Sequence, residues 1–92
     1  MDRQETISQL KKIKNIGPAM AKKLYDAEIY RLEDLIELGA EEAYIKIDES
    51  GGFCGIHHPA YLYALEGAII DCAWKDLPQE RKHELKAFAA RL

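Results

Sequence analysis

The chain has 92 residues, enough for one domain, over residues 1–92, with a core of modest size. Its composition, 48% apolar and 32% charged, is that of an ordinary soluble globular protein. No apolar run approaches the roughly 20 residues that span a bilayer, and the polar first five residues exclude a signal peptide, so we expect no membrane association and a cytoplasmic location.

The net charge of −3 hides an uneven distribution along the chain. Residues 1–30 carry +2, residues 31–76 carry −7 and residues 77–92 carry +2. Five lysines and no acidic residue lie between Ser8 and Tyr25. An acidic total therefore does not exclude a phosphate-binding face on the first helices, although solvated helix surface is the alternative interpretation of these lysines.

The first predicted element is a helix that ends near Lys14, after frayed residues 1–5 and a cap at Thr6 or Ser8. Apolar residues recur on one face of this helix, at every third position: Ile7, Leu10 and Ile13. Asn15 and Gly17 belong to residue types that tolerate positive φ, so the chain reverses there into a second helix over residues 18–27.

Two further helices are predicted over residues 29–38 and 40–48, separated by Gly39. The second of them is expected to bury three side chains: Ala43, Tyr44 and Ile47. A shift of 22 residues places the apolar positions of the first hairpin on those of this second pair, including Gly17 on Gly39. Residues 7–48 are therefore predicted to form paired hairpins in which the apolar pattern is duplicated and the lysines are not. The alternative is a chance coincidence that helical periodicity alone produces.

A glycine-rich loop over residues 50–58 precedes two packing helices over residues 59–92. Pro59 opens the first of them, in which Gly67 indicates a close approach of another helix. Pro78 opens the last helix, and Trp74 between the two is expected to be a core anchor. The predicted fold class is all-α, with five or six short helices and no sheet, because every apolar run has helical spacing.

The segment Ile16-Gly17-Pro18 resembles the helix-hairpin-helix (SAM-like) motif, which reads hydrophobic-Gly-hydrophobic-Gly before Pro and a basic residue. Asn15 replaces the first glycine, and Ala19 stands where a lysine is common. The resemblance implies that free amides at the start of the second helix hold a DNA phosphate, which the helix dipole favours. The alternative is a helix turn with a packing role only.

The candidate nucleic-acid-binding residues all belong to this hairpin: Lys14, Asn15, Ile16, Gly17, Ala19, Met20, Lys22 and Lys23. Asn15 and Gly17 are expected to shape the turn, while amides near Ala19 and Met20 face the anion. DNA affinity is expected to be weak, because one hairpin neutralises few phosphates. The alternative function is a helical protein-interaction or dimerisation domain without nucleic-acid binding.

Several blocks of the sequence, taken together, resemble the C-terminal domain of TfoX/Sxy proteins, bacterial regulators tied to natural competence. They span roughly residues 10–85 and are Asn15-Ile16-Gly17-Pro18, Leu32-Glu33-Asp34-Leu35, Leu38-Gly39-Ala40-Glu41-Glu42-Ala43-Tyr44, Leu62-Tyr63-Ala64-Leu65-Glu66-Gly67-Ala68, Trp74 and Leu77-Pro78. The resemblance implies a role in competence or transcription regulation. Members often carry an additional N-terminal domain, which this sequence is expected to lack. Glu28 departs from the family, which favours glycine there, and residues 51–55 look inserted.

Catalysis and metal binding find little support in the sequence. Cys54 and His57 have the spacing of a metal-ligand pair, but a structural zinc needs four ligands, and the two solvated histidines His57 and His58 are the simpler interpretation. Cys72 fits the apolar face of its helix, and both cysteines are expected to be reduced. Neither a thiol nucleophile with an orienting residue nor a nucleotide loop is evident, so we expect no cofactor, no metal and no enzyme.

Overall fold

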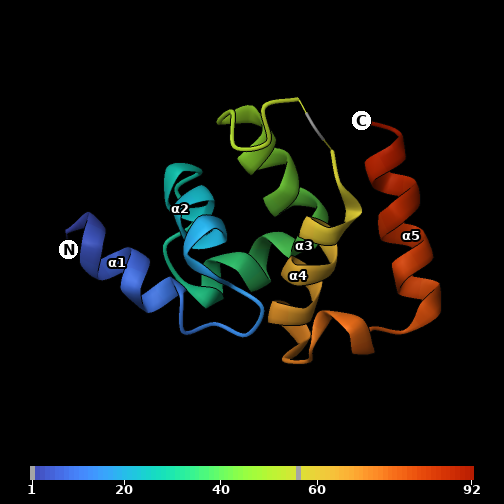
Figure 1. Cartoon of the computed structure of the whole chain (residues 1–92), viewed down its shortest axis with the longest axis horizontal. Coiled ribbons are helices and arrows are strands. Elements are labelled where there is room, and N and C mark those ends of the chain that lie inside the picture. The colour runs from blue at the N-terminus through green and yellow to red at the C-terminus, as the bar shows by residue number, and fades with distance from the viewer. Residues whose placement is uncertain (1, 56) are drawn as a thin grey trace.

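The computed structural model describes residues 2–55 and 57–92, and helices are the only regular elements in these two ranges (Figure 1). The elements are α1 (Arg3–Leu10), α2 (Pro18–Asp26), α3 (Leu32–Glu49), α4 (Pro59–Ile70), the short 3₁₀ helix η1 (Trp74–Asp76) and α5 (Gln79–Ala90). The all-α prediction is confirmed. No helix in the described residues is both long enough and apolar enough to cross a membrane.

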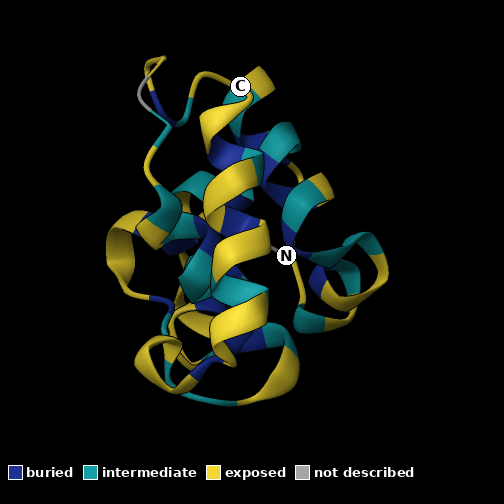
Figure 2. Ribbon diagram, turned by 90° about the vertical axis from the view of Figure 1, so that its right-hand side faces the viewer, coloured by how far each residue is buried: buried dark blue, intermediate teal, exposed yellow. Residues whose placement is uncertain are grey.

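The helix α4 occupies the centre of the molecule and packs against α3, α5 and η1. The hairpin of α1 and α2 lies at one end of the 38 Å long axis, and α5 lies at the other end (Figure 1). α5 turns its exposed residues outward and buries Leu85 and Ala89 against the rest (Figure 2). The two ends of the molecule are thus linked through α4 and its neighbours.

The core draws at least one large side chain from each α-helix. The largest fully buried side chains are Tyr44, Leu10, Leu24, Ile29, Leu35, Ile47, Leu62, Leu65 and Leu85. The inward positions predicted for the segment after Gly39 are confirmed, since Ala43, Tyr44 and Ile47 are all buried. Burial of such side chains from one face of each helix supplies the main favourable free energy of folding.

The predicted break at Gly39 is present inside α3, where this residue has φ 82° and ψ 165°. Gly17 likewise has an extended ψ directly before a helix. Four residues after Gly17 and Gly39 stand Ala21 and Ala43, and both alanines are fully buried. The segments before the two glycines differ, because residues 11–17 are not helical whereas the helix of α3 continues to residue 38. The burial pattern matches the predicted repeat at Ala21 and Ala43 alone, because in each of the other apolar pairs one residue is buried and the other only partly buried.

The start of α1 differs from the prediction. Asp2 caps the helix by accepting a hydrogen bond from the Glu5 amide at 2.8 Å, so residues 3–5 are helical rather than frayed, and Met1 lies outside the described residues. Thr6 is buried within the helix and its hydroxyl donates to the Asp2 carbonyl, so neither Thr6 nor Ser8 is the cap. Aspartate is among the best N-cap residues, and it acts one turn earlier than predicted.

The end of α1 also differs, because the helix stops at Leu10 rather than near Lys14. Beyond it the amides of Lys12 and Ile13 bond to carbonyls three residues back, at 3.1 Å each. Such i to i+3 turns preserve a three-residue apolar spacing without continuing the α-helix. The periodicity that placed Ile13 on the helix is therefore real, but it belongs to a tighter turn.

Trp74 is half exposed, at 51%, so its predicted role as a core anchor is wrong. Leu77, three residues later, fills the core position between α4 and α5 instead. Pro78 lies just outside α5 as its N-cap residue, one position before the helix starts. The predicted start of the last helix at Pro78 is thus correct to within one residue, whereas the buried residue before it is Leu77 and not Trp74.

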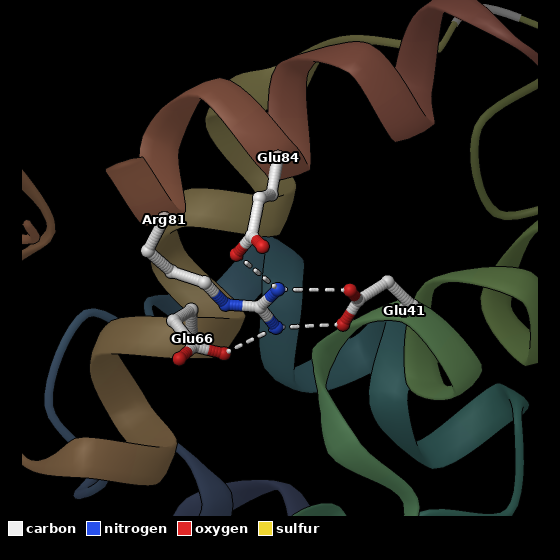
Figure 3. A network of polar contacts seen from close by, with 4 residues as sticks. All are labelled: Glu41, Glu66, Arg81 and Glu84. Atoms are coloured by element: carbon white, nitrogen blue, oxygen red, sulfur yellow. Dashed lines mark hydrogen bonds and ion pairs between the residues drawn. The ribbon is translucent and has the colours of Figure 1, made fainter. Parts of the chain in front are cut away.

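An ionic network fixes α5 to the centre of the molecule (Figure 3). The Arg81 guanidinium donates to both carboxylate oxygens of Glu41 in α3, at 2.9 and 2.7 Å, and to Glu66 in α4 at 3.1 Å. Glu84, on the next turn of α5, accepts at 3.4 Å. The bidentate bond to Arg81 lowers the pKa of Glu41, and the carboxylates of Glu41 and Glu66 raise the pKa of Arg81.

We predict that Arg81→Ala lowers the free energy of unfolding by about 1–2 kcal/mol at neutral pH, since the network is partly solvated. The folded pKa of Glu41 lies below its ordinary value of 4.5, so this stabilisation is complete above that pH and is lost as pH falls through the folded pKa. Urea unfolding at neutral and acidic pH measures both effects. Arg31→Ala removes an exposed ion pair with Asp34 and is the control, with an expected change within about 0.5 kcal/mol.

Gly67 in α4 is buried, and the predicted close approach is present, although its partner is not another helix. A Cβ at this position would overlap the side-chain amide of Asn15 and lie 2.6 Å from the Cys72 carbonyl oxygen. Gly67→Ala is therefore expected to lower the free energy of unfolding by roughly 1–3 kcal/mol. Gly17→Ala, with nothing within 4 Å of the added Cβ, is the matched control for urea unfolding, and an equal loss in both variants would contradict the prediction.

Candidate nucleic-acid interface

The hairpin turn over residues 11–17 is shaped by Asn15 and anchored by Ile16. Asn15 has φ 70°, in the left-handed region that asparagine tolerates better than most residues. The Ile16 amide bonds to the Ile13 carbonyl at 3.0 Å, and the Ile16 side chain is buried in the core. The predicted reversal of the chain is confirmed, but Asn15 alone has a positive φ, since Gly17 has φ −91°.

The side chain of Asn15 bridges the hairpin to the segment that follows α4. Its Nδ2 donates to the Cys72 carbonyl at 2.9 Å, and its Oδ1 accepts from the Trp74 amide at 3.3 Å. These partners lie 57 and 59 residues away in sequence. A glycine, which the helix-hairpin-helix motif has here, offers the positive φ but neither hydrogen bond. The departure from the motif at Asn15 therefore has a structural reason.

The first turn of α2 leaves two backbone amides without a hydrogen-bond partner among the described residues. Gly17 is the N-cap residue and provides no side-chain cap, and Pro18 has no N–H. The first amide to make an intrahelical bond is that of Ala21, to the Gly17 carbonyl at 2.9 Å. Within the described part of the chain, the amides of Ala19 and Met20 have no hydrogen-bond partner. Two donors and the positive end of the helix dipole thus remain available to an anion.

The eight predicted residues divide by what the fold does with them. Lys14 and Lys22 are exposed, whereas Ile16 and Met20 are buried and offer only their backbone. The Lys23 ammonium group is engaged elsewhere, because it donates to the Gly52 carbonyl at 2.7 Å and lies over aromatic rings of the neighbouring loop and α4. Lys23 therefore holds the loop against α2, a role that sequence reasoning missed.

An open groove of about 450 Å³ lies beside these free amides. The N-terminal residues of α2, the first half of α4 and η1 line it: Asn15, Gly17, Pro18, Ala19, Met20, Ala60, Tyr61, Ala64 and Trp74. None of these side chains is charged, and the exposed Trp74 is the largest of them. Sequence reasoning missed the α4 side of the groove. Its only signal was a lone tryptophan next to Lys75 and Asp76, in a segment with little apolar periodicity.

The loop that raised the question of metal binding has a packing role in the part that the structure describes. His57 Nε2 lies 2.9 Å from Asp48 Oδ1, and His58 Nδ1 accepts from the Ala60 amide at the start of α4. Phe53 stacks on Tyr44 with ring centroids 4.4 Å apart, and burial raises the pKa of the Tyr44 hydroxyl. No group of three or more His, Cys, Asp or Glu suited to a metal ion occurs among the described residues.

The geometry defines a small helical domain whose hairpin presents an uncapped helix N-terminus beside an apolar groove. The chain belongs to the TfoX C-terminal domain family, whose model matches residues 6–89. The fold is similar to the crystal structure of an uncharacterised protein from Listeria monocytogenes, with a TM-score of 0.79 and 34% identity over 87% of this chain and 88% of the other. No protein of curated function is significantly similar to the chain.

The Asn15 bridge makes two substitutions informative. Asn15→Gly keeps the positive φ and loses both hydrogen bonds, so we expect the free energy of unfolding to fall by roughly 1–3 kcal/mol. Asn15→Ala also places alanine in the left-handed region, which costs about 1 kcal/mol more. Urea unfolding of the two variants measures the difference. Equal stability of Asn15→Gly and the wild type would show that the bridge contributes nothing.

Proposed function

We propose that this domain is a weak, sequence-independent nucleic-acid-binding module of the TfoX regulatory type that acts in the cytoplasm. The observation that carries the proposal is the uncapped N-terminus of α2, where the amides of Ala19 and Met20 are free and Lys14 and Lys22 are exposed on either side in sequence. Amides and lysines of this kind suit a phosphate group. Because the chain belongs to the TfoX C-terminal domain family, the proposal includes a role in competence or transcription regulation.

Weak affinity follows from the small number of charges available. Lys14 and Lys22 are the exposed lysines nearest to the helix terminus in the sequence, since Lys23 is bonded to Gly52. The segment from residue 31 to residue 76 carries −7 and repels the same phosphate backbone. Phosphate contacts position a protein without reading sequence, so this hairpin is expected to bind different sequences equally well.

A second candidate function, protein interaction or dimerisation, is favoured by the uncharged groove and the half-exposed Trp74. Exposed aromatic residues in apolar depressions are typical of the centres of protein interfaces. In this alternative the hairpin only packs, and its free amides are hydrated. A catalytic function is not part of either proposal.

The double variant Lys14→Ala/Lys22→Ala tests the nucleic-acid proposal. Each lost phosphate contact is expected to flatten the slope of log K against log salt by about one unit, for any duplex sequence. Fluorescence anisotropy with a labelled duplex, at several salt concentrations, measures this slope. Both lysines are exposed, so the variant should fold as the wild type does.

The control variant Lys46→Ala/Lys86→Ala removes the same charge from α3 and α5, outside the hairpin turn and the first turn of α2. It is expected to reduce affinity less than the hairpin variant does. Equal binding by the two double variants at low salt would mean that the hairpin has only a packing role. The protein-interaction function would then take its place.

A further inference from the structure

The groove and the free amides form one continuous surface, because Ala19 and Met20 at the start of α2 also line the groove. The opposite wall comes from Ala60, Tyr61 and Ala64 of α4, and Trp74 completes it. The tryptophan is held there by its backbone, whose amide bonds to Asn15, while 51% of the residue stays exposed. A large aromatic ring is thus presented to solvent within one depression that also carries two unpaired donors.

The chemistry of this surface selects a ligand that joins an anion to a flat apolar group. The free donors and the helix dipole suit the anion, and the neighbouring Lys14 and Lys22 have the complementary charge. The groove contains no carboxylate that would repel it. Its alanine floor and the Trp74 ring suit a planar group. An apolar helix from a partner would fill the groove but leave the charge and the donors unused.

We infer that the groove binds an unpaired base of a single-stranded nucleic acid, stacked on Trp74, while the adjoining phosphate lies at the amides of Ala19 and Met20. This inference rests on the proposed function, which it narrows from nucleic acid in general to single strands. Aromatic side chains stack on any exposed base, so sequence tolerance is retained. In an intact duplex the bases are already stacked on one another, and Trp74 has nothing to contact. The groove therefore adds affinity for single strands alone.

Trp74 is the only tryptophan of the chain, so its intrinsic fluorescence reports on the groove directly. Titration with oligothymidine of about ten nucleotides is expected to quench this fluorescence in a saturable manner, and a duplex of equal length is expected to quench it little. Anisotropy with labelled oligonucleotides gives the affinities of the variants in parallel. Addition of inorganic phosphate alone controls for quenching by the anion.

Trp74→Ala keeps the backbone amide that bonds to Asn15, so the fold should survive, which circular dichroism and urea unfolding check. It is expected to weaken binding to the single strand by about 5- to 150-fold, the equivalent of 1–3 kcal/mol per stacked base, and to leave binding to the duplex unchanged. Tyr30→Ala removes another exposed aromatic side chain, one outside the groove, and is expected to change neither affinity.

The outcomes separate this inference from the function on which it rests. If Trp74→Ala binds single strands as the wild type does while Lys14→Ala/Lys22→Ala binds both forms weakly, the stacking is overturned and the phosphate site stands. If the wild type binds neither form at low salt, the proposed function fails as well. If Trp74→Ala instead converts a dimer into a monomer in sedimentation experiments without affecting oligonucleotide binding, the occupant of the groove is a second copy of the chain.

Discussion

The side-chain amide of Asn15 is the interaction on which the arrangement of this domain depends. Its two hydrogen bonds join the hairpin turn to the carbonyl of Cys72 and the amide of Trp74. The same side chain packs directly on Gly67, so the path of α4 at that point leaves no room for a Cβ. One residue thereby fixes the start of α2 relative to the segment that carries Trp74. Both walls of the groove owe their relative positions to it.

Two of the basic side chains, those of Arg81 and Lys23, are bound in contacts within the molecule. Arg81 binds three carboxylates at the α5 end of the molecule, and two of them, Glu41 and Glu66, belong to the acidic middle of the sequence (Figure 3). Lys23 is bonded to the loop through Gly52. The bonds from Arg81 to Glu41 and Glu66 and from Lys23 to Gly52 stabilise the tertiary structure, because each joins segments at least 15 residues apart in the sequence. The total charge of the chain is therefore a poor guide to the potential near α2.

Local signals in the sequence predicted most of the fold and the hairpin side of the candidate site. Gly39 and Pro59 act within their own turns of the chain, so their positions predicted the helix limits well. The bridge from Asn15 to Trp74 escaped the same reasoning, because it joins residues 59 positions apart in the sequence. A tryptophan is buried more often than not, and nothing in the neighbouring sequence indicates that this one stays at the surface. The periodicity of apolar residues cannot predict a contact between a turn before α2 and a short 3₁₀ helix after α4.

The helix terminus at the centre of the proposal is held from both sides by the core. Ile16 and Met20 are buried, while the residues between them, Gly17, Pro18 and Ala19, are exposed. Burial on either side fixes the direction of the amides of Ala19 and Met20 before any ligand arrives. A site fixed in advance loses little conformational entropy on binding, so a few contacts retain more of their free energy. The burial of Ile16 and Met20, which gives the hairpin its packing role, therefore also holds the amides in a position that suits an anion.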